Sequence, residues 1–356
     1  KRNIGFNTAT NIESDKGWES ANPKTVLNFT AVGYFFARNL YDKYKVPIGL
    51  INCSYGGTPA EAWLNESELK DFPAYYEPCI KFKDSALVKS ITTKDKLLAD
   101  QWNDLINKTD LGLTEKWQYP TTNYTDWKSI QMPNFWQDQG LKGVASGVVW
   151  LTKEINITPT MLGKNALLKL GNIIMKDFSY FNGVLVGTTS NKYAPRKYSI
   201  PANLLKPGIN TITIRIVNES GNAGFIKDKP YQMEIGDSVI DLKGEWKYNI
   251  GILANPLPPQ TFIRWKPMGL YNAMIAPLTN YAIKGAIWYQ GESNTGYPKD
   301  YAALMQTLIK DWRSKWGLGD FPFFFVQLAN FMESRTEPTE SAWATLRQEQ
   351  LRTLSV

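Results

Sequence analysis

The sequence contains no histidine in 356 residues. Either the protein uses no histidine chemistry, or its histidine lies outside these residues. Cysteine is scarce as well, because only Cys53 and Cys79 are present, and two cysteines give no disulfide framework and no metal-binding spacing. Cys53 follows an apolar run, a position typical of a small buried hydrophobic residue.

Basic clusters and long apolar segments are also missing. The net charge is +7, but the lysines and arginines are scattered, as in TTKDK and LKGEWK. A nucleic-acid-binding surface would concentrate them on one face, so we expect no nucleic-acid partner. No segment approaches the roughly 18–20 apolar residues of a transmembrane helix, so we expect no membrane span. There is no phosphate-binding glycine loop, zinc spacing or EF-hand, so we expect no metal and no organic cofactor.

Helix and strand patterns alternate at both ends of the chain. A helical repeat of apolar residues predicts a helix over 24–45, and the apolar run VPIGLINCS predicts a buried strand over 46–54. Near the end, the patterns predict strands over 284–290 and 320–331 and helices over 297–317 and 341–354. Continuous apolar strands between helices favour an α/β fold with a parallel sheet covered on both faces.

The middle of the chain has a different character. Residues 116–250 contain short β-rich runs, with turn signals at Asn182-Gly183 and Pro207-Gly208, which predict an antiparallel sandwich. Residues 65–110 are rich in Lys, Glu and Leu and are expected to be helical. We therefore divide the chain into the first part of an α/β domain (1–110), an inserted β-sandwich (111–252) and the second part of the α/β domain (253–356).

Two loops follow predicted parallel strands, where open α/β sheets bind ligands. They are CSYGGTPAEAW and YQGESNTGYPKDY. Glycine lets the backbone approach a ligand and leaves N–H groups available to stabilise an oxyanion, and Gln290 and Asn294 can add side-chain donors. We expect the two loops to face one crevice. The alternative is that each is only a tight turn.

Ser54 and two carboxylates are further candidates. Ser54 lacks the first glycine of a G-x-S-x-G elbow, whose place Asn52 occupies, and no histidine is available as its base. We therefore interpret Ser54 as a turn or supporting residue. Glu61 and Glu292 could form a pair of the kind that glycoside hydrolases use, but structural roles as hydrogen-bond acceptors are favoured.

Four segments together resemble the sialate O-acetylesterase family, a branch of the SGNH/GDSL hydrolases. They are NFTAVGYFFARNL, VPIGLINCSYGGTPAEAW, GAIWYQGESN, and FPFFFVQLANF with the WATLRQEQ that follows it. The resemblance implies a three-layer α/β/α domain interrupted by a jelly-roll-like, carbohydrate-binding-like module. It also implies a serine esterase that removes O-acetyl groups from sialic acid or another acetylated glycan through an acetyl-serine intermediate.

The resemblance also assigns roles to residues. A backbone N–H of Gly56 or Gly57 and the Gln290 side chain would form the oxyanion hole, while Glu292 and Asn294 would shape their loop. The family's nucleophile, in a G-Q-S-N-like block, and its histidine, in a D-x-H-P-like stretch, have no match here. We therefore expect the chain to be the middle of a longer protein, with its serine and histidine outside these residues.

Two other functions stay open. The first is a catalytically inactive carbohydrate-binding protein in which Trp127, Trp136 and Trp150 stack on sugar rings. The second is a glycoside hydrolase that uses Glu61 and Glu292. Family habit and several N-x-S/T sequons suggest a secreted or periplasmic protein, and the oligomeric state stays undetermined.

Overall fold

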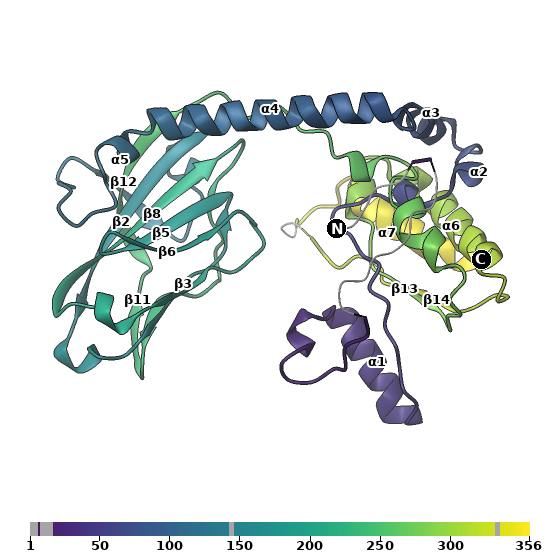
Figure 1. Cartoon of the computed structure of the whole chain (residues 1–356), viewed down its shortest axis with the longest axis horizontal. Coiled ribbons are helices and arrows are strands. Elements are labelled where there is room, and N and C mark those ends of the chain that lie inside the picture. The colour runs from purple at the N-terminus through teal and green to yellow at the C-terminus, as the bar shows by residue number, and fades with distance from the viewer. Residues whose placement is uncertain (1–5, 8–16, 142–145, 332–334) are drawn as a thin grey trace. The chain divides into compact units, whose positions relative to one another are not determined.

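The computed structural model describes residues 6–7, 17–141, 146–331 and 335–356. The chain forms two compact units. One combines residues 1–92 with 261–356, and we call it the split unit. The other consists of residues 93–260, and we call it the β unit. The helix α4 (Ser85–Thr109) begins in the split unit and ends in the β unit (Figure 1).

The β unit contains two larger antiparallel sheets. The six-stranded sheet has the order β1-β12-β2-β8-β5-β6, and the four-stranded sheet has the order β11-β10-β3-β7. Two short strands, β4 and β9, pair separately. The strands are β1 Lys128–Met132, β2 Gly147–Ile157, β3 Ala166–Leu170, β4 Ile173–Ile174, β5 Lys176–Phe181, β6 Val184–Thr189, β7 Lys197–Ile200, β8 Gly208–Asn218, β9 Gly224–Phe225, β10 Tyr231–Ile235, β11 Ser238–Asp241 and β12 Gly244–Leu253.

The two sheets share one hydrophobic core. Leu151 and Ile214 of the larger sheet belong to the same buried cluster as Leu168 and Met233 of the smaller one. Burial alternates residue by residue along β3 and β10, as it does when one face of a strand packs inward. The predicted antiparallel pairing of these strands is confirmed, whereas an inserted module of jelly-roll type stays a prediction. The turn signal at 182–183 joins β5 to β6, with both residues at positive φ.

The prediction of sugar-stacking tryptophans in this unit is wrong. Trp127 is 6% exposed, and Trp136 and Trp150 are fully buried. Trp150 donates its indole N–H to the carboxylate of Asp110 at 2.9 Å, so its polar edge is used inside the protein. A buried ring presents no face to a sugar, and these three tryptophans are core residues.

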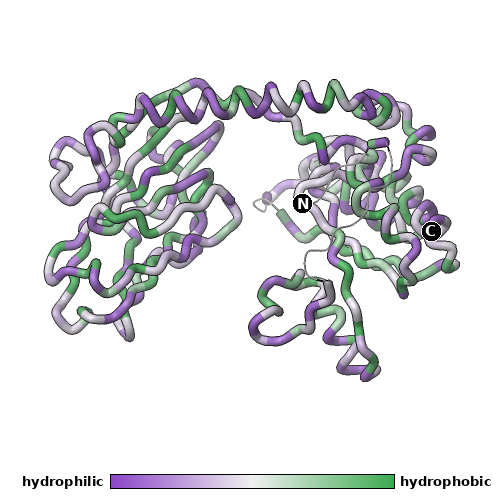
Figure 2. Tube along the Cα trace, in the orientation of Figure 1, coloured by the Kyte–Doolittle hydropathy of each residue, from purple (hydrophilic) through white to green (hydrophobic). Residues whose placement is uncertain are grey.

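Helices dominate the rest of the structure. They are α1 Ala31–Tyr44, α2 Glu66–Leu69, α3 Pro73–Phe82, α4 Ser85–Thr109, α5 Leu111–Thr114, α6 Tyr301–Trp316 and α7 Ala342–Arg352. The predicted helices over 297–317 and 341–354 are confirmed as α6 and α7, and the helical character of 65–110 as α2 to α4. Hydrophobic and hydrophilic residues are interspersed along α4 (Figure 2). The predicted helix at 24–45 is confirmed as the shorter α1.

The predicted parallel sheet is present only as one pair of short strands. Among the described residues, the single parallel pairing joins β13 (Ala286–Trp288) to β14 (Phe323–Phe325). Residues 46–54 form no strand, and most of them are exposed, so the expected buried strand is wrong. A strand exists only where a neighbouring strand completes its backbone hydrogen bonds, and the sheets of the described residues do not include this segment. The α/β class is confirmed, but an SGNH-type sheet stays a prediction.

The core of the split unit supports both candidate loops. Trp63 is the last residue of the first loop, Trp288 ends β13 just before the second, and their rings meet edge to face at 6.0 Å. Trp288 in turn meets Trp312 of α6 at 5.8 Å. Leu304 of α6 and Leu346 of α7 belong to the same core. Both loops are therefore anchored on one packed cluster. No described helix has the length and apolarity needed to cross a membrane.

Candidate functional site

The first loop contains a tight turn at Gly56 and Gly57. The Thr58 hydroxyl donates to the Tyr55 carbonyl at 2.8 Å and accepts from the Trp63 indole at 3.0 Å, which closes the turn. Gly57 has φ +76°, a conformation that favours glycine, and a Cβ there would lie 3.0 Å from the Trp265 ring. In the described part of the chain, neither the Gly56 nor the Gly57 N–H donates a hydrogen bond.

Ser54 lies in the exposed part of this loop. Its hydroxyl donates to Asn52 Oδ1 at 2.6 Å, a local side-chain contact two residues away. Such a contact is typical of a turn residue rather than of a nucleophile held by a base. The preceding Cys53 is half-buried, and its thiol donates to the Met274 carbonyl at 2.9 Å.

The second loop follows β13 and is bonded directly to the first. Ser293 Oγ donates to the Gly57 carbonyl at 2.7 Å, and Gln290 Nε2 donates to the Thr58 carbonyl at 3.0 Å. Asn294 Oδ1 accepts from the Ala60 N–H at 2.9 Å. These bonds, which cross more than 230 positions of sequence, bring the two loops together, and the crevice that they were expected to face stays a prediction.

Asn294 is the centre of this connection. It is 3% exposed, and its Oδ1 also accepts from Gln290 Nε2 at 2.7 Å. Its Nδ2 donates to Glu61 Oε2 at 2.9 Å. Burial raises the pKa of Glu61, although the hydrogen bond from Asn294 opposes the shift. Glu61 is thus held as an acceptor between the loops, in agreement with the structural role favoured for it above.

Gln290 is held from several sides. Its Oε1 accepts from the Tyr301 hydroxyl at 3.0 Å, and its carbonyl accepts from Gln350 Nε2 at 3.1 Å. Burial raises the pKa of Tyr301 to about 12, so this hydroxyl stays a donor at neutral pH. Both Nε2 hydrogens of Gln290 are already directed at Thr58 and Asn294.

Some of these contacts have no counterpart in the sequence predictions. Tyr301, Gln350 and Thr58 hold the loops but belong to segments that the sequence marks only as helix or turn. Gly291 adds to this arrangement, since it has φ +154° and a Cβ there would lie 3.0 Å from Gln350 Nε2. Glu292, by contrast, has an exposed side chain. Its carbonyl accepts from the Thr295 hydroxyl at 2.8 Å.

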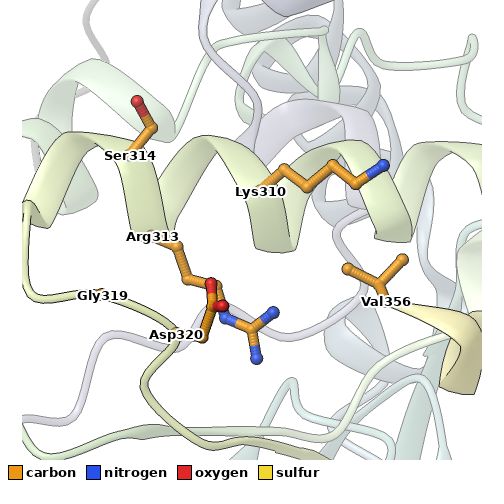
Figure 3. A pocket seen from close by; sticks show the side chains of 6 residues that line it. All are labelled: Lys310, Arg313, Ser314, Gly319, Asp320 and Val356. Carbon is orange, nitrogen blue, oxygen red and sulfur yellow. The ribbon is translucent and has the colours of Figure 1, made fainter.

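A separate hollow lies elsewhere in the split unit. Its volume is about 460 Å³, and its lining combines α6, the loop that follows it and the last residue (Figure 3). The lining residues are Lys310, Arg313, Ser314, Gly319, Asp320 and Val356. None of them is a predicted site residue. Among the described residues, no group of three or more Cys, Asp or Glu side chains is arranged to hold a metal ion.

Comparison with known proteins finds similarity to one family over part of the chain. Residues 235–356 match the family model described as a carbohydrate esterase, sialic acid-specific acetylesterase. The sialate O-acetylesterase of Mus musculus is 48% identical over 71 residues, which are 18% of this chain and 13% of that protein. The sialate O-acetylesterase of Homo sapiens is 43% identical over 75 residues, 19% of this chain and 14% of that protein. The matches thus span about an eighth of these relatives.

Among solved structures, β-glucuronidases share limited similarity with the chain. One from an uncultured Clostridium sp. has a TM-score of 0.27 and 20% identity, covering 30% of this chain and 19% of its own. The enzyme of Ruminococcus gnavus has a TM-score of 0.28 and 16% identity, covering 39% and 26%. Scores this low support no conclusion about fold or activity.

Proposed function

We propose that the chain is part of a serine esterase that removes O-acetyl groups from sialic acid or another acetylated glycan, because residues 235–356 match the model of the sialic acid-specific acetylesterases. The observation that carries this proposal is the turn at Gly56 and Gly57. It is fixed to the loop of Gln290 and Asn294, and its two N–H groups donate to no other group in the described residues.

These N–H groups suit the chemistry of ester cleavage. A serine hydroxyl attacks the acetyl carbon, its proton passes to a base, and negative charge collects on the former carbonyl oxygen. Donors already fixed near that oxygen stabilise the charge without reorganising, and losing one costs on the order of 10²–10³ in turnover. Collapse of the intermediate releases the sugar hydroxyl and leaves acetyl-serine, which water then hydrolyses.

The proposed donor role of Gln290 carries a cost. Its two N–H bonds hold Thr58 and Asn294, so donating to an oxyanion requires giving up one of them. We propose that the glycine N–H groups are the primary donors and that Gln290 fixes their loop. Since the sequence has no histidine, the nucleophile and its histidine base would come from residues beyond these 356.

Acetate release tests this proposal. The substrates are an O-acetylated sialic acid and p-nitrophenyl acetate, and the full-length gene product is compared with the 356-residue chain. We expect acetate from the longer protein and none from the chain alone. Release of free sugar from a glycoside without acetate would favour the alternative that uses Glu61 and Glu292. Absence of both products would refute enzymatic activity and favour a binding protein.

A further inference from the structure

A short segment of the split unit packs against the glycine turn. Residues Ile263–Trp265 form a single 3₁₀ turn, and the Trp265 ring lies under Gly57. The Phe262 ring stacks on Trp265 with 4.3 Å between centroids and 20° between planes, while Phe262 itself stays 46% exposed. An aromatic surface fixed in orientation therefore adjoins the loop proposed to bind the acetyl group.

Arg264 places a positive charge beside the glycine turn. Its guanidinium carbon lies 4.4 Å from the centre of the Tyr55 ring, and Nη1 donates to the Tyr55 hydroxyl at 2.6 Å. These contacts fix the planar group beside the glycine turn. A guanidinium has five N–H donors in a rigid fork that matches a carboxylate, so most of its donors remain after the bond to Tyr55.

The charge of Arg264 has no counter-ion in the described part of the chain. Arg264 is half-buried, forms no ion pair there, and its Nε is buried without a partner. The two buried arginines of the β unit, by contrast, each have an aspartate as counter-ion. In the β unit, Arg196 contacts Asp177 at 2.8 Å and Arg215 contacts Asp110 at 2.6 Å. A half-buried guanidinium without a carboxylate partner has N–H donors and a charge that an anion can still use.

We propose that Arg264 binds the carboxylate of an acidic sugar, with the exposed face of Phe262 beside the sugar ring. This inference rests on the proposed function, which supplies sialic acid as the substrate class. A sialic acid carries a carboxylate at neutral pH, whereas most other acetylated sugars are neutral. Arg264 therefore makes the site selective for acetyl groups on an anionic sugar.

Binding measurements test this without turnover. Calorimetric titration of the 356-residue chain compares N-acetylneuraminic acid with its neutral methyl ester. We expect the acid to bind roughly 10- to 100-fold more tightly, as a charge-assisted contact implies. Arg264→Met should abolish this preference while its stem still packs on Tyr55. The matched control is Lys266→Met, which removes the same charge two residues away from Arg264. The Lys266 ammonium lies over the Phe82 ring.

The outcomes separate this site from the proposed function. Equal binding of acid and ester by the unmodified chain would overturn the site, as would an Arg264→Met variant that keeps the preference. An equal loss of both ligands would also overturn it, since that indicates a structural role. Arg264→Gln, which can still donate to Tyr55, provides a second variant if Arg264→Met misfolds. If the preference follows Arg264 but no preparation releases acetate, the carboxylate site stands and the esterase proposal fails.

Discussion

Replacing Asn294 by aspartate would test the connection between the two loops. The change is nearly isosteric, and the remaining Oδ1 can still accept from the Ala60 N–H and from Gln290 Nε2. It replaces the amide that donates to Glu61 Oε2 at 2.9 Å by a second oxygen. Two carboxylate oxygens then face each other at hydrogen-bond distance, in a place where burial already raises the pKa of Glu61.

The cost follows from proton uptake. The pair can keep its geometry only if one carboxyl is protonated, and holding a proton on a group with an ordinary pKa near 4.3 costs about 1.4 kcal/mol per pH unit above it. This amounts to about 3.7 kcal/mol at pH 7 and about 1 kcal/mol at pH 5. The folded variant holds a proton that the unfolded chain releases, so its stability falls as the pH rises.

Urea denaturation at pH 5 and pH 7, followed by tryptophan fluorescence, measures this cost. We expect Asn294→Asp to lose about 3.7 kcal/mol at pH 7 and about 1 kcal/mol at pH 5. Glu61→Gln alone should change little, since its Oε1 still accepts from Asn294. In the double variant the new glutamine amide can donate to the new carboxylate, which restores the bond. A loss that does not depend on pH, or a double variant as unstable as Asn294→Asp, would refute the reasoning.

Two further predictions concern the split unit. Asp311 of α6 is 4% exposed, and burial raises its pKa to about 6. The folded state therefore favours the protonated carboxyl of Asp311, and stability is lost as the pH rises through 6. Asparagine carries no proton to lose. Asp311→Asn should therefore raise the unfolding free energy by about 2–3 kcal/mol at pH 8 but little at pH 4. An equal gain at both pH values in urea titrations would contradict this. Gly57→Ala should lower the unfolding free energy by about 1–3 kcal/mol because of its φ of +76° and the nearby Trp265 ring. Gly56→Ala, whose Cβ meets nothing within 4 Å, is the control and should cost under about 0.5 kcal/mol in the same titrations.

Local signals predict the helices well. The periodic segment 297–317 becomes α6, with Pro298 just before it and Gly317 at φ +62° after its last residue. The segment 341–354 becomes α7, and the Ser341 side chain accepts from the Ala344 N–H as an N-cap. Helical hydrogen bonds join residues four positions apart, so the sequence carries nearly all the information that such an element needs.

Strand predictions fail where a neighbouring strand, rather than the segment's own sequence, determines whether a strand forms. The apolar run at 46–54 signals a tendency to be buried, yet Ile51 is 42% exposed and the segment belongs to none of the sheets that the described residues form. The helix before it shows the same limit. Val32, on the predicted apolar stripe of α1, is 44% exposed, while Gly33 and Ala37 are buried instead. An apolar run or an apolar helix face indicates that a surface is apolar, but only the tertiary structure determines which residues pack against it.

The candidate site was predictable in position but not in its bonding. Glycine-rich loops after two strand patterns suggested that residues 52–63 and 290–294 meet, and they do. Two of the hydrogen bonds that hold the loops together are accepted by the main-chain carbonyls of Gly57 and Thr58. Every residue has such a carbonyl, so the residue types in a sequence do not indicate which carbonyls form these bonds. This bonding changes the interpretation of Gln290. A glutamine beside an oxyanion loop suggests a donor, but a glutamine whose two N–H groups are both bonded fixes the loop in place. Under the proposed function, the glycine N–H groups, which donate to nothing else among the described residues, would be the donors that an oxyanion could use without breaking the structure that positions them.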